Sequence, residues 1–273
     1  MTPPDLKAIE LLLDDAVLTV RLNRPDKSNA LDDRLWQEIR SVFQWADQHP
    51  GVRVVLLAGA GRHFCAGIDL AMLGGIMSRI ADADDARSRE KLYALIRDLQ
   101  DCLSSIERCR KPVLAAVHGA CLGGGLDMVA CCDMRYASAD AVFAIREIDL
   151  GMVGDVGSLQ RLPHLMPPGL VRELAYTGRD LDADEARQSG LVNAVFPDAE
   201  ALFAGAMRIA RRIAGKSPLA VRGTKSALNF ARDHSVADGL EQVANWNAAT
   251  LLSADLREAV AAAREKRTPR FND

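Results

Sequence analysis

Three carboxylic acids fall within a short, glycine-rich part of the chain: Asp127, Glu147 and Asp155. Each has an ordinary structural explanation. The dipole of a helix start would stabilise a carboxylate at Asp127 whatever its function. Glu147 can pair with Arg146, and Asp155 can cap a helix. Buried together, however, the three acids would shift one another's pKa values, as acids in active sites do. The grouping therefore predicts proton transfer as the chemistry of this stretch.

The chain just before Asp127 has the pattern of a strand, a tight turn and a helix start. An apolar run at 112–117 leads to Gly119 and the triple glycine 123–125, and an apolar run with helical character begins at Leu126. Glycine lets the backbone approach a ligand closely, and a helix start leaves N–H groups free for an anion. The loop 65–70 (CAGIDL) can supply a second amide. Two converging amides stabilise an oxyanion, although each segment taken alone also fits an ordinary connection.

Several other kinds of site are not supported by the sequence. The glycines at 119–124 lack the G-x-G-x-x-G order of a dinucleotide site, and Ala210 replaces the first glycine of a phosphate-binding loop. The six cysteines and five histidines show no spacing suited to zinc, so we expect no metal and mostly buried thiols. His118 follows a predicted strand, where a hydrogen-bonded structural role is expected.

Composition limits the class of protein further. The 273 residues are 49% hydrophobic and carry a formal net charge of -3, with only 5% aromatic residues. This balance argues against nucleic acid as a partner. The chain has no apolar run of membrane-spanning length and no basic segment before an apolar one at its start. We therefore expect a soluble, cytoplasmic protein with no membrane partner.

Hydrophobic periodicity predicts an α/β protein with a helical C-terminal third. Strands are expected at 16–22, 52–58, 112–117 and 191–196, and a mobile segment at 66–82. Helices are expected at 29–46, 86–109, 168–177, 182–189 and 199–214, and from Ser217, with Ser235 and Ser253 capping two more.

These motifs together resemble the enoyl-CoA hydratase/isomerase (crotonase) superfamily. The resemblance rests on LNRPDKSNAL at 22–31, HFCAGIDL at 63–70, the triple-glycine segment at 111–138, FAIREIDLGMVGDVGSLQRLP at 143–163 and the region 178–197. It covers the chain from about residue 10 to its end. Asp155 beside Asp127 and Glu147 resembles the branch that isomerises 3,5-dienoyl-CoA to 2,4-dienoyl-CoA, since hydratases typically lack an acid at position 155.

The resemblance implies a crotonase-like spiral of ββα units (1–197), which holds the active site, and a helical trimerisation region (198–273). It implies an acyl-CoA thioester of fatty-acid β-oxidation as substrate, no separate cofactor, and a homotrimer or homohexamer. The oxyanion amides would be those of Ile68 and Gly124. The CoA-binding residues would be Lys27, Ser28, Ala30, Ala66, Gly67, Asp69 and Leu70.

The resemblance also suggests a mechanism. Asp155 would remove the C2 proton, Glu147 would deliver a proton to C6, and Asp127 would hydrogen-bond to Glu147 and tune it. Two alternatives remain open: a hydratase in which Asp127 and Glu147 activate water, and a non-catalytic acyl-CoA- or RNA-binding relative.

Overall fold

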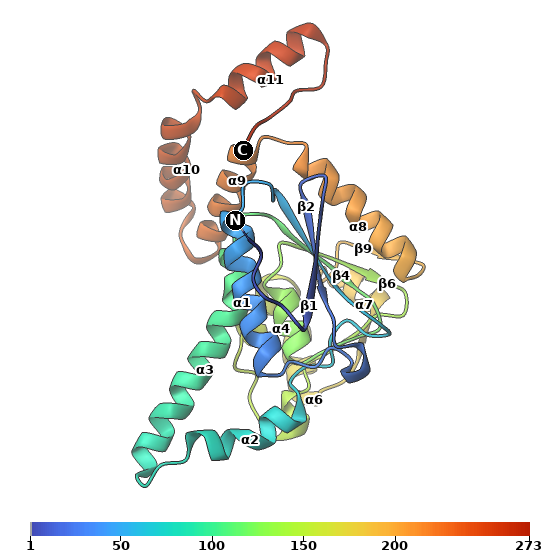
Figure 1. Cartoon of the computed structure of the whole chain (residues 1–273), viewed down its shortest axis with the longest axis vertical. Helices are drawn as coiled ribbons and strands as arrows, with labels where there is room; N and C mark the ends of the chain where they lie inside the picture. The colour runs from blue at the N-terminus through green and yellow to red at the C-terminus, as the bar shows by residue number, and fades with distance from the viewer. Residues whose placement is uncertain (1) are drawn as a thin grey trace.

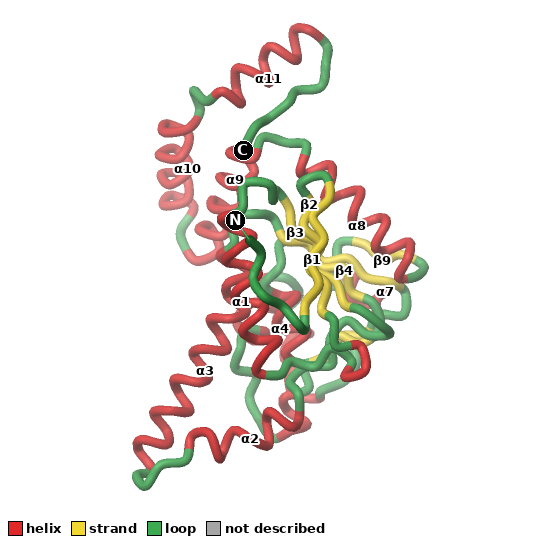
Figure 2. Tube along the Cα trace, viewed as in Figure 1, coloured by secondary structure: helices red, strands yellow, loops and turns green. Residues whose placement is uncertain are grey.

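The computed structural model describes residues 2–273, and its central element is a six-stranded sheet with helices on both faces (Figures 1 and 2). The strand order is β1-β2-β3-β4-β6-β9, in which β1 is antiparallel to β2 and every later neighbour is parallel. The strands are β1 (Ile9–Asp14), β2 (Val17–Leu22), β3 (Val54–Gly59), β4 (Val113–Val117), β6 (Met134–Ser138) and β9 (Ala194–Phe196). Burial on both faces explains why β3 and β4 are continuous apolar runs.

A second, three-stranded sheet lies beside the first and carries the loops of the candidate site. It consists of β5 (Ala120–Leu122), β7 (Val142–Ala144) and β8 (Leu181–Asp182), in the order β5-β7-β8. Consecutive strands therefore divide between the sheets: β4 joins the large sheet and β5 the small one, and β6 and β7 repeat this arrangement. Isolated bridges extend the small sheet, because Cys65 pairs with Cys121 and Leu31 pairs with Ile68.

The helices cover the sheet in two layers. Buried side chains of α1 and α3 pack with alternate strand residues such as Leu57 and Ala115 on one face, and α8 packs with Leu56 and Leu114 on the other. The α-helices are α1 (Asp33–Gln48), α2 (Leu70–Ile80), α3 (Asp85–Arg108), α4 (Gly124–Ala130), α5 (Ser158–Arg161), α6 (Pro168–Thr177), α7 (Ala183–Gln188), α8 (Ala199–Ala214), α9 (Pro218–Asp233), α10 (Val236–Thr250) and α11 (Ala254–Glu265). Three short 3₁₀ helices are η1 (Pro25–Lys27), η2 (Glu147–Leu150) and η3 (Leu162–His164).

The α/β layers confirm the fold class predicted from periodicity, but the structure differs from the predicted elements in several places. The segment expected to be mobile at 66–82 contains helix α2, whose N-terminus is capped by the Asp69 side chain through the Ala71 N–H. The first helix begins at Asp33 rather than at residue 29, because the Asp32 side chain caps it through the Leu35 N–H. Five strands were not predicted at all: β1, β5, β6, β7 and β8.

The C-terminal helices divide between the sheet and an arm. Helix α8, the first element of the predicted region 198–273, lies against the large sheet, whereas α10 and α11 extend away from it and α10 packs on α9 (Figure 1). Ser235 and Ser253 cap α10 and α11 as predicted. No helix within residues 2–273 combines the length and the apolar character needed to cross a membrane.

Truncation of a buried side chain of α8 should destabilise the whole domain. Leu202 is 1% exposed and packs between α8 and the sheet, so Leu202→Ala should lower the free energy of unfolding by about 2–5 kcal/mol. Urea denaturation followed by circular dichroism measures this change. Arg208→Ala, at an exposed position of the same helix, is the matched control and should change stability by less than about 0.5 kcal/mol. Equal effects of the two variants would contradict this packing.

Candidate active site

A cavity of about 500 Å³ brings together most of the predicted site residues. The predicted CoA-binding residues all line it: Lys27, Ser28, Ala30, Ala66, Gly67, Asp69 and Leu70. Ile68, Gly124, Glu147 and Asp155 line it as well, together with Trp36 and Leu99, which sequence analysis did not single out. Asp127 alone of the predicted residues is not part of the cavity wall.

Two backbone amides converge on this cavity. Ile68 is held by a bridge in which Leu31 N–H donates to Gly67 O (2.8 Å) and Asp69 N–H donates to Leu31 O (3.0 Å). Gly124 is the first residue of α4, where the amide has no partner within the helix. Within residues 2–273, neither the Ile68 N–H nor the Gly124 N–H donates a hydrogen bond to another residue. Both amides are therefore available to a ligand oxygen.

The close approach of the two segments requires glycine. A Cβ atom built on Gly67, whose φ is 90°, would lie only 2.9 Å from the Leu122 carbonyl oxygen and 3.6 Å from the Gly124 nitrogen. Gly123 has a φ of 48°, which turns the chain from β5 into α4. The same geometry brings Glu147 near, since its Oε1 would be 3.1 Å from a Cβ on Gly123.

Asn29 fixes the loop that carries the predicted CoA-binding residues Lys27, Ser28 and Ala30. Its side chain is fully buried and donates to the carbonyl oxygens of Ala60 (2.9 Å) and His63 (2.8 Å), while accepting from the Arg24 N–H (2.8 Å). Asn29 also has a φ of 55°, a conformation that asparagine tolerates better than most residues. Because the sequence pattern predicted a helix that starts at Asn29, the hydrogen-bonding role of this side chain was not recognised from sequence.

Asp127 is fully buried behind the cavity. Its Oδ1 accepts a hydrogen bond from the Ser158 N–H at the start of α5, and its Oδ2 has no partner among the described residues. Burial, together with the nearby charge of Glu147, raises the pKa of Asp127 to about 7. The predicted hydrogen bond from Asp127 to Glu147 is not present in the structure, because Asp127 is bonded to α5 instead.

Glu147 opens η2 and is half-buried, and its Oε2 is enclosed without a partner in residues 2–273. Desolvation raises its pKa, and repulsion from Asp155 adds to the rise. The expected alternative, pairing with Arg146, does not occur, since Arg146 forms ion pairs with Asp149 and Asp180. Glu147 therefore holds its proton more tightly than an exposed glutamic acid does.

Asp155 lies in the loop between η2 and α5 and is more exposed than Glu147. The surrounding protein partly desolvates its carboxyl and raises its pKa. The N-cap of α5 is Gly157, so Asp155 does not have the helix-capping role that sequence analysis kept as an alternative. Its carboxyl is free to face the cavity that it lines.

The remaining candidates have structural roles. All six cysteines are buried and free, and the His118 Nε2 lies 2.9 Å from the Gly61 carbonyl oxygen. Across residues 2–273, no group of three or more His, Cys, Asp or Glu side chains is arranged to hold a metal ion.

Comparison with known sequences identifies the family. Residues 13–273 match the family described as enoyl-CoA hydratase/isomerase. The chain belongs to this family. It is 46% identical over 275 residues to the peroxisomal delta(3,5)-delta(2,4)-dienoyl-CoA isomerase of Arabidopsis thaliana, covering 99% of each chain. It is 45% identical to the mitochondrial protein of that name from Homo sapiens, covering 92% of this chain and 77% of the human one.

Solved structures of this enoyl-CoA hydratase/isomerase family share the fold. A crystal structure of enoyl-CoA hydratase from Bacillus anthracis superimposes with a TM-score of 0.89 at 31% identity, covering 97% of this chain and 99% of that one. The crotonase-like architecture expected from the sequence is thereby confirmed.

The raised pKa of Asp127 should make stability depend on pH. The folded protein holds this proton up to about pH 7, whereas the unfolded chain releases it near 3.8. Between these pH values the folded state therefore binds more protons than the unfolded chain. The stability that the Asp127 proton contributes is lost as pH rises from about 4 to about 7. The loss is on the order of 4 kcal/mol, at 1.36 kcal/mol per pKa unit.

Asp127→Asn should flatten this dependence, since the amide oxygen can still accept from Ser158 but cannot ionise. Urea denaturation at a series of pH values measures the slope for the wild type and the variant. Equal slopes between pH 4 and pH 7 would show that Asp127 is already ionised in the folded protein.

Proposed function

We propose that this chain isomerises 3,5-dienoyl-CoA to 2,4-dienoyl-CoA in fatty-acid β-oxidation. The observation that carries the proposal is the pair of free amides at Ile68 and Gly124 beside Glu147 and Asp155 in one cavity. Relatives that bear the name dienoyl-CoA isomerase match nearly the whole chain at 45–46% identity and support it. Coenzyme A enters as part of the thioester, and the proposed reaction uses no separate cofactor.

The proposed reaction begins with the acidic proton at C2 of the thioester. Asp155 removes this proton, and the resulting negative charge spreads through a dienolate to the thioester oxygen. The amides of Ile68 and Gly124 donate to that oxygen, and each donor is worth roughly 2.7–4 kcal/mol in comparable sites. Glu147 then delivers a proton to C6, which gives the conjugated 2,4-diene.

The environments of the two acids fit these separate roles. Glu147 is the more buried acid, with an enclosed Oε2, and its raised pKa favours the protonated form that can donate. Asp155 is more exposed and reaches the ionised form that acts as a base more readily. Asp127 does not line the cavity, so it does not exchange protons with the substrate, and its part is to hold the start of α5 next to the loop of Asp155.

The cavities next to the two acids suggest where the rest of the acyl chain lies. Glu147 and Met152 separate the main cavity from an apolar one of about 340 Å³ near α6, lined by residues such as Val171 and Ala175. Asp155 instead borders a charged cavity of about 420 Å³. An apolar tail would enter the apolar cavity, which places C6 and the carbons beyond it on the side of Glu147.

Assembly into a homotrimer or homohexamer is part of the proposal. It is supported by large apolar side chains that α9 and the C-terminal arm leave exposed, which are typical of subunit contacts. These side chains are Leu228, Val236, Leu240, Leu251 and Leu252. A cytoplasmic location remains the prediction from sequence, although the names of the relatives cited above place those proteins in peroxisomes and mitochondria.

Removal of the proposed base should abolish most of the isomerase activity. Asp155→Asn should lower kcat for a 3,5-dienoyl-CoA by about 10²–10⁴-fold, the usual contribution of a general base, with little change in KM. The measurement is the rise of conjugated-diene absorbance in the ultraviolet. Asp149→Asn, which changes an acid that lines the same cavity but pairs with Arg146, is the control and should retain most activity.

The same assay separates the alternatives. Loss of absorbance with a 2-enoyl-CoA and no reaction with the 3,5-diene would indicate a hydratase, in which Asp155 has no catalytic role. Binding of CoA thioesters without turnover of either substrate would indicate a non-catalytic relative. Full isomerase activity in Asp155→Asn would refute the assignment of the base.

Filling the apolar cavity should shorten the acceptable acyl chain. Each methylene that enters an apolar site contributes up to about 0.8 kcal/mol, so the wild type should prefer substrates with several carbons beyond C6. Ala175→Phe should lower kcat/KM for these long substrates by about tenfold or more and leave the shortest 3,5-dienoyl-CoA nearly unaffected. The short substrate is thus an internal control, and an equal loss for both lengths would place the tail elsewhere.

A further inference from the structure

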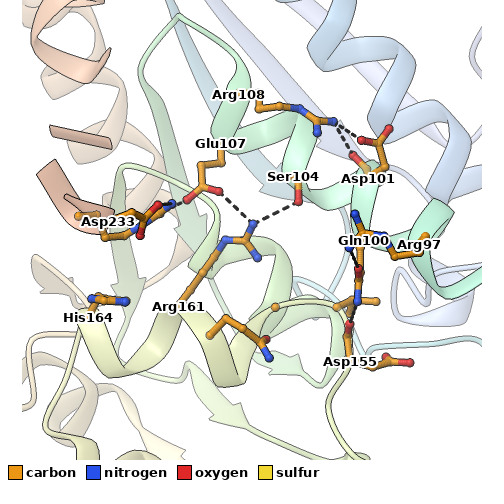
Figure 3. Close-up of a pocket in the computed structure, with 14 residues that line it drawn as sticks. Arg97, Gln100, Asp101, Ser104, Glu107, Arg108, Asp155, Arg161, His164 and Asp233 are labelled. Atoms are coloured by element: carbon orange, nitrogen blue, oxygen red, sulfur yellow. Dashed lines mark hydrogen bonds and ion pairs between the residues drawn. The ribbon is translucent and has the colours of Figure 1, made fainter. Parts of the chain in front are cut away.

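We propose that Gln100, on helix α3, is a positioning residue for the base Asp155. Its side-chain amide donates a 2.6 Å hydrogen bond from Nε2 to the Asp155 carbonyl oxygen (Figure 3). This inference rests on the proposed isomerase function, and it adds a residue that touches neither the substrate nor the CoA-binding loop.

The loop that carries Asp155 has little to hold it in place. It contains no regular secondary structure between η2 and α5, and Gly151, Gly154 and Gly157 give its backbone wide conformational freedom. Among residues 2–273, Gln100 provides the one hydrogen bond that another residue makes to Asp155. The following residue, Val156, is 7% exposed and anchors the loop by packing alone.

Gln100 is itself oriented by a charged neighbour. Its Oε1 accepts from the Arg97 Nη1 at 2.8 Å, one turn earlier on α3. A cation bound to the amide oxygen polarises the amide and strengthens the hydrogen bond that its N–H donates. Figure 3 shows Arg97, Gln100 and Asp155 in sequence along one wall of the charged cavity.

The location of Gln100 distinguishes positioning from catalysis. Gln100 lines the charged cavity but not the CoA cavity, whereas Asp155 and Val156 line both. The bond therefore reaches Asp155 from the side away from the substrate and fixes its main chain, leaving the carboxyl free. Because a general base acts only within hydrogen-bond reach of the proton, a misplacement of about 1 Å can cost about 10²-fold in rate.

The test compares two methionine substitutions of similar size. Gln100→Met keeps the length of the side chain and removes the donor to Asp155. Gln37→Met is the matched control, since Gln37 Nε2 also makes an exposed hydrogen bond to α3, at 3.0 Å to Asp98, and neither Gln37 nor Asp98 lines either cavity that Asp155 borders. Both variants should lose similar thermal stability, which the melting temperature measures.

Only Gln100→Met should alter the chemistry. With a 3,5-dienoyl-CoA, its kcat should fall about tenfold while KM stays within about twofold of the wild type. The kinetic isotope effect on kcat for substrate deuterated at C2 should rise, because abstraction of that proton becomes slower relative to the other steps. A merely structural loss would not raise this isotope effect.

A second variant, with a smaller expected effect, keeps the test decisive if Gln100→Met fails to fold. Arg97 is exposed, and Arg97→Met leaves the Gln100 bond in place but removes its polarising partner, so kcat should fall about two- to threefold. The inference is overturned if Gln100→Met matches Gln37→Met in kcat and isotope effect, or if Arg97→Met alone shows the larger loss. A wild type that does not turn over the 3,5-diene would instead refute the proposed function, and the inference with it.

Discussion

The buried hydrogen bond that the Ser158 backbone N–H donates to the Asp127 carboxyl is the contact on which the rest of the site depends. Helix α4 supplies the Gly124 amide at its first position and Asp127 in the same first turn. Asp127 then binds the start of α5, which directly follows the loop of Asp155. One seven-residue helix thus connects the oxyanion amide, the buried acid and the loop of the base. A small shift of α4 would disturb all three together.

The position of α4 is in turn set by close backbone contacts. A Cβ on Gly125 would lie 2.8 Å from the Cys65 carbonyl oxygen, and one on Gly124 would lie 2.8 Å from the Leu31 side chain. A larger residue at Gly125 would require the backbone at Cys65 to move, and one at Gly124 would require the Leu31 side chain to move. The triple glycine therefore serves packing, one of the two explanations weighed for it from sequence. In the proposed reaction the same turn offers the Gly124 amide to the thioester oxygen.

Sequence patterns predicted the parts of the molecule that are governed by local or periodic signals. Helices α3, α6 and α8 have strong periodicity and clear ends, and their predicted bounds agree with the structure to within a residue. Strands β1, β5, β6, β7 and β8 escaped prediction. Strands β5, β7 and β8 have only two or three residues each, β1 exposes Leu12 and Leu13, and β6 contains the buried Arg135, so none shows a clear apolar pattern. Contacts such as those of Asn29 and Gln100 join segments at least 31 residues apart, and no periodicity encodes them.

The raised pKa values of the three acids also explain how an oxyanion can form among carboxylates. Three ionised carboxyls would repel a negative thioester oxygen, and two amides would compensate poorly. Burial raises the pKa of Asp127 and of Glu147, so each holds its proton more tightly than a carboxyl in water and adds less negative charge to the resting site. In the proposed reaction a negative charge moves from the base Asp155 to the thioester oxygen and then to Glu147. The total charge of the enclosed site stays constant, so no step has to create a new charge in a medium that stabilises it poorly.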